Sequence, residues 1–241
     1  MADYETAPFR FKQFTIEQRF ASMKVGFDGV LLGAWSDVAH CQRILDVGTG
    51  TGLVALMLAQ RTRTETRVHA VELDESAAIE ATQNVASTGW NDRVTVIHDS
   101  FQSFSKSCPR YDLLVSNPPY FGRDVASRDP RRALARHGSS HLLEELIRTA
   151  PSLLTDAGRL CIIVPSTRLD AICELARRTG LYARRQLAVR PLPHKPAHRI
   201  LLDFCRDSAS VVRHEQLTIE LRHHEYTAEF RELARDFYLA F

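Results

Sequence analysis

The sequence predicts an α/β fold, a mostly parallel sheet with helices on both faces. Short apolar segments alternate with helix-like segments through the middle of the chain, and this order is typical of a parallel sheet covered on both sides. The last two apolar segments, 181–192 and 198–206, have no helix between them, so the sheet is expected to end in an antiparallel pair. A length of 241 residues suits one large domain.

The elements follow from hydrophobic patterning in chain order. Earlier strands are expected at 41–48, 67–73, 93–99, 111–117 and 158–165. Helices are expected at 53–62, 74–89, about 140–155 and 167–179. The helix at 74–89 has clear limits, because Asp74 is a suitable N-cap and Gly89 a suitable stop.

The chain is expected to form a single domain, 1–241, with two appendages to a core at 37–206. Residues 1–36 are predicted to form a small hairpin at 9–18 and a helix at 27–36 laid across the sheet edge. The tail 207–241 is predicted to pack back on the core, because it has apolar residues at helical spacing: Phe230, Leu233, Ala234 and Phe237.

Composition narrows the function classes. No apolar run approaches the ~18 residues of a membrane span, and the first residues lack the apolar stretch of a secretory signal, so a cytoplasmic protein with no membrane partner is expected. The five cysteines form no CxxC pair, which argues against a zinc site or a disulfide framework. His194 and His198 have a metal-like spacing, but Pro196 between them favours a loop, and no metal is expected.

Positive charge is concentrated in the second half of the chain. Residues 1–120 carry 11 Lys+Arg against 14 Asp+Glu, whereas residues 121–241 carry 20 against 15. Arginine outnumbers lysine by 27 to 4, which favours bidentate contact with phosphate; a codon preference for arginine would look the same. The imbalance is weak evidence for a polyanionic partner.

A glycine-rich turn follows the first strand of the core. The strand runs into Asp46, and Gly48, Gly50 and Gly52 permit a tight turn whose backbone N–H groups and following helix can approach a ligand. Twenty residues beyond Gly52, the next strand ends in Glu72, a suitable acceptor for a ribose diol. The G-x-G-x-G spacing departs from the dinucleotide fingerprint, and the carboxylate beside the turn would repel a pyrophosphate.

The D-x-G-x-G-x-G turn and the strand order resemble the class I S-adenosylmethionine-dependent methyltransferases over residues 41–206. The resemblance implies a Rossmann-like, seven-stranded sheet with a terminal antiparallel pair, and S-adenosyl-L-methionine as cofactor. It also implies that Asp46, Gly48, Thr49, Gly50 and Gly52 hold the methionine part. By the same resemblance Glu72 and Leu73 lie at the ribose, and Asp99 binds the adenine amino group.

The sequence Asn117-Pro118-Pro119-Tyr120 ends the strand at 111–117. It resembles motif IV of amino-group methyltransferases. An exocyclic amine is a poor nucleophile, and two fixed acceptors, the Asn117 side-chain oxygen and the Pro118 carbonyl, would favour a pyramidal nitrogen as the methyl group arrives. The prolines keep that carbonyl rigid, so little reorganisation is needed. Tyr120 offers a flat face for a planar base.

Basic residues follow this motif. The segment 122–140 is predicted to be a mobile basic loop suited to a phosphate backbone, or else an ordinary solvated loop, and it carries Arg123, Arg128, Arg131, Arg132 and Arg136. Arg184, Arg185 and Arg190 add positive charge farther on, and the solvent face of an edge strand is an equal alternative for them.

Nearly the full chain resembles the bacterial tRNA(Val) N6-adenine methyltransferases. The likeness rests on "FRFKQFTIEQRFASMKVGFDGVLLGAW", "NPPYF" with the following "ARH", and the tail. It implies that Lys24 and Asp28 lie over the cofactor and that a flipped adenine meets Asn117–Tyr120, with Phe121 and His137 nearby. Phe27 stands where this family is expected to have threonine, and His137 stands where tyrosine is common; both differences lie near the predicted site.

The leading hypothesis is therefore an enzyme that methylates N6 of adenine in RNA, with tRNA as the expected partner. Glutamine methylation of a release factor uses the same motif, but residues 1–40 are too short for the usual helical N-terminal domain. Guanine methylation of ribosomal RNA is a further alternative. A noncatalytic RNA-binding scaffold is the alternative outside enzymes, and intact Asp46, Glu72, Asp99 and Asn117 weigh against it.

Overall fold

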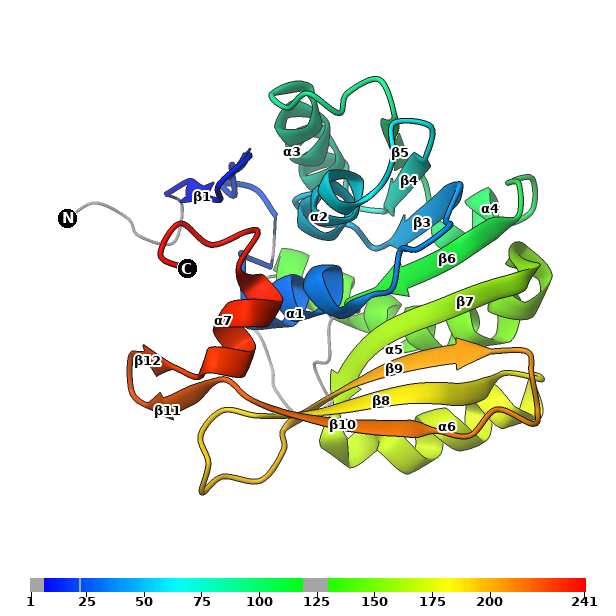
Figure 1. Ribbon diagram of the computed structural model, residues 1–241. Helices are drawn as coiled ribbons and strands as arrows, with labels where there is room; N and C mark the ends of the chain where they lie inside the picture. Colours follow the sequence, from blue (N-terminus) through cyan, green and yellow to red (C-terminus); the bar gives the residue numbers. More distant parts are fainter. Residues whose placement is uncertain (1–6, 22, 119–129) are drawn as a thin grey trace.

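A central sheet organises the protein. The computed structural model describes residues 7–21, 23–118 and 130–241, with only the backbone for 130–140 (Figure 1). Within these residues the sheet has eight strands in the order β10-β8-β9-β7-β6-β3-β4-β5. In chain order they are β3 Arg43–Val47, β4 Arg67–Glu72, β5 Val94–His98, β6 Tyr111–Ser116, β7 Leu154–Pro165, β8 Tyr182–Arg190, β9 Arg199–Cys205 and β10 Arg213–Thr218.

The strand directions confirm the predicted α/β class. Strands β5, β4, β3, β6 and β7 are parallel neighbours, and β9 runs antiparallel to both β7 and β8. The expected count of seven strands is wrong by one, because β10 pairs in parallel with β8. Its sequence, RHEQLT, has few apolar residues and gives no hydrophobic periodicity, so only the backbone pairing with β8 makes it a strand.

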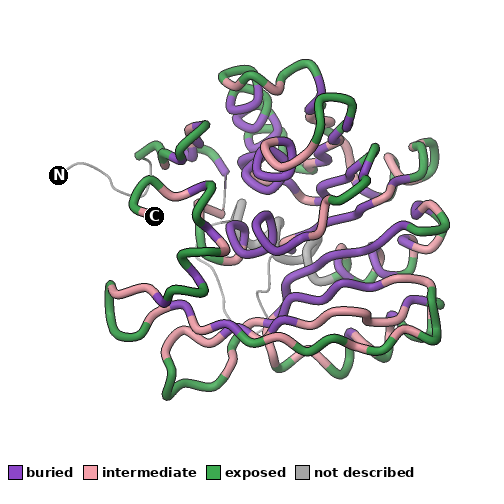
Figure 2. Tube along the Cα trace, viewed as in Figure 1, coloured by how far each residue is buried: buried purple, intermediate pink, exposed green. Residues whose placement is uncertain are grey.

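Helices cover both faces of the sheet (Figure 1). One face packs against α1 Phe27–Trp35, α2 Leu53–Arg61, α3 Glu75–Ala86 and α7 Ala228–Ala234. The other packs against α4 Phe101–Phe104, α5 Pro130–Leu153 and α6 Leu169–Arg178, with the short η1 Ser166–Arg168 before α6. Most of the buried residues lie in the central strands and in α1 and α2 (Figure 2). None of the described helices is long and apolar enough to cross a bilayer.

Two helix boundaries differ from the sequence prediction. α3 has Asp74 as its N-cap, with the side chain accepting from Ala77 N, but it ends three residues before Gly89. α5 begins at Pro130, so residues 130–140 are helical where a basic loop was predicted. Proline is favoured in the first helical turn, and the Ala, Leu and Arg residues that follow are good helix formers.

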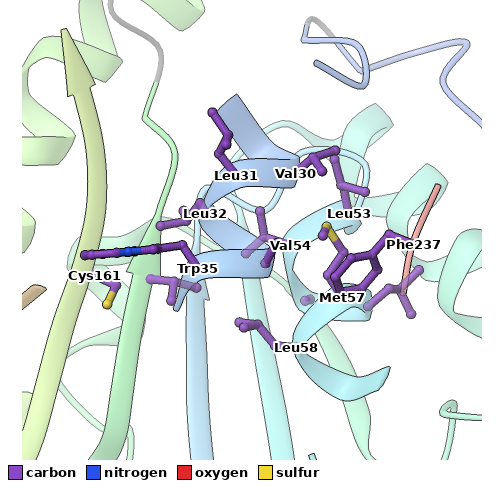
Figure 3. Packing of buried hydrophobic residues seen from close by; sticks show 14 of the residues in the cluster. Val30, Leu31, Leu32, Trp35, Leu53, Val54, Met57, Leu58, Cys161 and Phe237 are labelled. Carbon is purple, nitrogen blue, oxygen red and sulfur yellow. The ribbon is translucent and has the colours of Figure 1, made fainter. Parts of the chain in front are cut away.

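α1 lies on a face of the sheet, and its predicted place across the edge is wrong. Residues 29–35 are all buried, and the helix packs against α2 and β7 (Figure 3). A helix that is apolar on all sides must be covered on all sides, which an edge position would not provide. Trp35 points toward Cys161 of β7, while Val54 and Met57 of α2 meet the helix from the other side (Figure 3).

The two ends of the chain meet beside α1. The hairpin of β1 Phe9–Arg10 and β2 Thr15–Ile16 lies next to the C-terminal segment (Figure 1). Lys12 N donates to Phe237 O at 2.8 Å, and Lys12 Nζ donates to the carbonyls of Arg235 and Phe241, each at 2.7 Å. A second hairpin, β11 Glu220–Arg222 with β12 Glu225–Tyr226, precedes α7.

Candidate active site

The glycine turn connects β3 to α2 at the carboxyl end of the sheet. Gly48, Gly50 and Gly52 have φ values of 71°, 57° and 83°, in the left-handed region where a side chain would be strained. The N–H groups of Gly48 and Thr49 donate to Val71 O at 2.9 and 3.1 Å, which fixes the turn against β4. The predicted turn is therefore present, and its left-handed backbone favours glycine at these three positions.

Asp46 is buried beneath this turn, with 1% of its surface exposed. Its Oδ2 accepts a hydrogen bond from Thr49 Oγ1 at 2.6 Å and from Ala55 N at 3.2 Å. The pKa of Asp46 is raised to about 7. Burial is the largest cause, the two hydrogen bonds oppose the shift, and the nearby Glu72 carboxylate adds to it. The carboxyl group thus stabilises the turn and also lines the cavity described below.

Glu72, Leu73 and Asp99 lie together at the adjacent ends of β4 and β5. Glu72 Oε2 accepts from Gly50 N at 2.8 Å and Oε1 from Asp74 N at 2.9 Å, while Asp99 N donates to Glu72 O at 3.1 Å. Burial raises the pKa of Glu72. The Leu73 side chain is 64% exposed. These residues form a surface beside the glycine turn, referred to below as the shelf. They are not among the residues that line the cavity.

Asn117 follows β6 directly opposite the turn. Ser116 Oγ, fully buried, donates to Val47 O at 2.8 Å and so ties the ends of β6 and β3 together. Gly29 of α1 permits close approach here, since an added Cβ would lie 2.9 Å from Leu53 Cδ2 and 3.9 Å from Asn117 Nδ2. Pro118 is buried. Ser116 was missed by sequence reasoning, which treated it as part of an apolar strand.

The structure does not describe the side chains of several predicted site residues. Pro119, Tyr120, Phe121, Arg123 and Arg128 lie outside the described residues. For Arg131, Arg132, Arg136 and His137 the structure describes only their helical backbone in α5.

A cavity of about 900 Å³ joins the turn to the C-terminal part of the chain. One side holds the predicted residues Lys24, Asp28, Asp46, Gly48, Thr49, Gly50 and Asn117. The other side holds residues that sequence reasoning did not assign: Pro165, Pro191, His198, Arg199, Ile219, Glu220, His223, His224 and Tyr226. The sequence places these residues 48 or more positions after Asn117 and offers one signal, the adjacent histidines 223 and 224.

Asp28 and Arg199 connect the two sides. Arg199 Nε lies 2.8 Å from Asp28 Oδ2, and both side chains are about one quarter exposed. Lys24 Nζ donates to the carbonyls of Gln18 and Arg19, so its ammonium group is held by the N-terminal segment at the cavity wall. Burial lowers the pKa of the neighbouring His198, with the Arg199 charge adding to the shift.

The N-terminal segment is attached to α3 by buried polar side chains. Glu80, 1% exposed, accepts from the N–H groups of Arg19, Phe20 and Ala21. Asn84, also 1% exposed, accepts from Glu17 N at 2.8 Å and donates to Glu17 O and Thr51 O, each at 2.9 Å. The segment 17–21 is therefore tied through α3 to the glycine turn.

Two of the three arginines of β8, Arg184 and Arg185, make contacts within the protein. Arg185 pairs with Glu215 at 3.2 Å and its guanidinium lies 4.2 Å from the centre of the Trp35 ring, while Arg184 lies 3.7 Å from the buried Asp203 carboxylate. β8 has neighbours on both sides, so the edge-strand alternative is also wrong. In the described part of the chain, Glu220, His223 and His224 form the one group of three His, Cys, Asp or Glu residues close enough to share a metal ion.

Comparison with known proteins agrees with this architecture. Residues 20–177 match the family described as "Methyltransferase small domain". A predicted O-methyltransferase from Agrobacterium tumefaciens superposes with a TM-score of 0.66 at 21% identity, covering 87% of this chain and 96% of that one. A ribosomal protein L11 methylase from Lactobacillus delbrueckii gives 0.57 at 16% identity, with coverages of 80% and 84%. These two structures establish the fold alone.

Sequence relatives are closer. A tRNA1(Val) (adenine(37)-N6)-methyltransferase from Trichodesmium erythraeum is 44% identical over 235 residues, which is 97% of this chain and 98% of that one. The protein of the same name from Bacteroides thetaiotaomicron is 43% identical over 231 residues, with coverages of 96% and 97%. The chain therefore belongs to the family of the tRNA1(Val) (adenine(37)-N6)-methyltransferases.

Proposed function

We propose that this protein uses S-adenosyl-L-methionine to methylate N6 of an adenine in RNA, namely the adenine next to the anticodon of tRNA(Val), in the cytoplasm. One observation carries the proposal: Asn117 at the end of β6 and the glycine turn at the end of β3 line the same cavity. The acceptor proposed for the substrate amino group and the turn proposed to hold the cofactor thus line the same cavity. The relatives are named for this reaction on tRNA1(Val).

The residues at the turn fit the cofactor. Asp46 is a buried carboxyl group on the cavity wall, a suitable partner for an ammonium group. Glu72 already accepts two backbone N–H bonds, and each carboxylate oxygen has a second lone pair for a ribose hydroxyl. The exposed Leu73 offers an apolar face and Asp99 an acceptor at the outer end of the shelf. When bound, S-adenosylmethionine supplies an electrophilic methyl group on its sulfonium.

The protein's part in the reaction is to position the amine. The Asn117 side-chain oxygen and the Pro118 carbonyl accept the two hydrogens of the exocyclic nitrogen, so its lone pair turns toward the methyl donor. Fixed acceptors of this kind act without reorganisation during the reaction. Tyr120 is the stacking partner of the flipped base in this proposal. No residue needs to act as a strong base, since the methylated cation loses its proton readily.

The test is methyl transfer to separated acceptors. Purified protein is incubated with methyl-labelled cofactor and with tRNA, ribosomal RNA or release factor, and the RNA is digested to nucleosides. We expect label in N6-methyladenosine from tRNA. Label in glutamine would identify the release factor as the acceptor, and label in guanosine would identify ribosomal RNA. Label in none of the pools would support a noncatalytic scaffold.

A further inference from the structure

The part of the cavity wall that comes from the β11–β12 hairpin has no role in the reaction described so far. In the turn of this hairpin, His223 and His224 are both exposed. Their rings are 3.9 Å apart with an interplanar angle of 32°, and the Glu220 carboxylate lies within 4.8 Å of their nitrogen atoms. Two adjacent imidazoles and one carboxylate therefore border the same cavity as Asn117.

The hairpin is held firmly in place. Glu220 N donates to Pro191 O at 3.1 Å, and Thr227 N donates to Ile219 O at 3.0 Å. Tyr226 packs on Phe230 and Phe241, with ring centres 5.3 and 5.2 Å apart. His224 adopts a φ of 66° at the tip, so the turn geometry sets the direction of its side chain. The histidines are thus positioned by the fold although they are exposed.

Aromatic surface continues from the hairpin to α1. Phe27, which lines the cavity and is 39% exposed, packs edge-on against Tyr226 with ring centres 6.2 Å apart. The wall therefore combines flat rings, N–H donors and a carboxylate acceptor. Flat rings stack on bases, imidazole N–H groups donate to phosphate, and a carboxylate accepts from a ribose 2′-hydroxyl.

We infer that the β11–β12 wall binds the RNA nucleotide that flanks the target adenosine. In this arrangement His223 and His224 contact the base and phosphate of the flanking nucleotide, while Glu220 accepts from its ribose. The inference rests on the proposed function, because it requires an RNA substrate at Asn117. A cavity of about 900 Å³ leaves room for it, being near the upper end of the ~300–1,000 Å³ range of ligand sites.

A metal ion is the competing occupant of these three side chains. Two histidines and a carboxylate can bind a divalent transition metal, but only if their lone pairs converge on one point. The two ring centres lie 3.9 Å apart with their planes tilted by 32°. Both rings are exposed and therefore open to a base, and a bound metal becomes an outcome of the experiment.

The experiment measures steady-state methylation of tRNA by the double variant His223→Ala/His224→Asn. Asparagine tolerates the left-handed backbone of position 224. We expect KM for tRNA to rise about tenfold or more through lost stacking, while the Kd for S-adenosylmethionine stays within about twofold. The matched control is His40→Asn, since His40 is also exposed, has a φ of 63° and lies outside the cavity lining.

The outcomes are distinguishable. If the wild-type protein methylates no RNA, the proposed function fails; if it methylates tRNA and the double variant has an unchanged KM, only the present inference fails. A third result is that a chelator reduces the activity of the wild type as much as the double substitution does, with added Zn²⁺ restoring the wild type. That result would identify a metal site and overturn nucleotide binding. An equal rise in KM for His40→Asn would also overturn it.

Discussion

Single polar side chains at strand ends define the chemistry of this protein. Asn117 is only partly buried at the mouth of β6, whereas Asp46 is almost fully buried under the glycine turn. Both line the cavity, but their environments give them different tasks. In the proposed reaction Asn117 presents an uncharged acceptor to the substrate, whereas Asp46 stabilises a turn with a carboxyl group whose charge depends on pH.

The role of Asn117 predicts a separation of binding from turnover. In Asn117→Ala we expect methyl transfer to fall by about 10²-fold or more, as when a transition-state hydrogen-bond acceptor or donor is lost, while the Kd for S-adenosylmethionine changes little. Single-turnover methylation and equilibrium binding measure the two quantities. Asn91→Ala, at an exposed position, is the control. Unchanged turnover in Asn117→Ala would remove this residue from the mechanism.

The raised pKa of Asp46 predicts a pH-dependent stability of the cofactor-free protein. The folded carboxyl group has a pKa of about 7, against roughly 3.9 for an unfolded aspartate. Between these values unfolding releases a proton, so the free energy of unfolding falls as pH rises, by at most about 1.4 kcal/mol per pH unit. Above pH 7 the contribution no longer changes.

Asp46→Asn lacks this titration. We therefore expect the variant to gain stability relative to the wild type between pH 5 and pH 7.5 in urea unfolding. Groups that do not interact with Asp46 titrate equally in both proteins and cancel in the difference, whereas the neighbouring Glu72 is coupled to it. An identical difference at the two pH values would show that the pKa of Asp46 is not raised.

At the scale of elements, the close contact of α1 and α2 determines where the N-terminal segment meets the cavity. Gly29 and Gly33 face α2, and a Cβ at Gly33 would lie 2.7 Å from Met57 Sδ and 2.9 Å from Met57 Cβ. Both distances are shorter than normal contacts, so the helices could not keep their spacing. Both helices contribute side chains to one buried hydrophobic cluster (Figure 3).

Gly33→Ala is therefore expected to destabilise the protein. Alanine gains about 1 kcal/mol of helix propensity, but overpacking costs about 1–3 kcal/mol. Overpacking should dominate because Met57 Cβ cannot move without the α2 backbone. Differential scanning calorimetry of Gly33→Ala and Gly89→Ala tests this, since a Cβ at Gly89 would meet nothing within 4 Å. An unchanged or higher melting temperature for Gly33→Ala would contradict the packing argument.

At the scale of the whole molecule, both ends of the chain contribute to the cavity. Lys24 and Asp28 come from the N-terminal segment, and His223, His224 and Tyr226 come from the C-terminal one. Glu80 connects the first of these segments to the core by accepting three backbone N–H groups. The cavity is thus closed by contacts between residues about 60 positions apart.

Glu80→Gln tests this connection. The glutamine amide has one acceptor oxygen where the carboxylate has two, so one buried N–H of residues 19–21 loses its partner at a cost of about 1–3 kcal/mol. We expect a Kd for S-adenosylmethionine that is higher by about tenfold, because Lys24 would no longer be held at the cavity. Glu65→Gln, at an exposed site, should leave the Kd unchanged. Equal affinities in the two variants would limit Glu80 to a role in stability.

The sequence by itself determined the α/β class, the glycine turn and the position of Asn117 at a strand end, because these depend on local periodicity and on residues whose backbone preferences are strong. Asp46 and Gly48 are neighbours in the chain, so their proximity needs no tertiary information. The sequence did not predict the eighth strand, because β10 has weak apolar patterning. It also did not predict the helical start of α5, because the arginines at 130–140 are typical of an exposed basic loop as well.

Only the tertiary structure decided what surrounds the turn. Asp28 pairs with Arg199 and Glu80 contacts residues 19–21, and these contacts join positions 59 to 171 residues apart. His223 and His224 line the cavity although they follow Asn117 by more than 100 residues. No local propensity encodes such contacts. They arise because parallel strands place all their carboxyl ends at one edge, where the two chain ends then cover the opening.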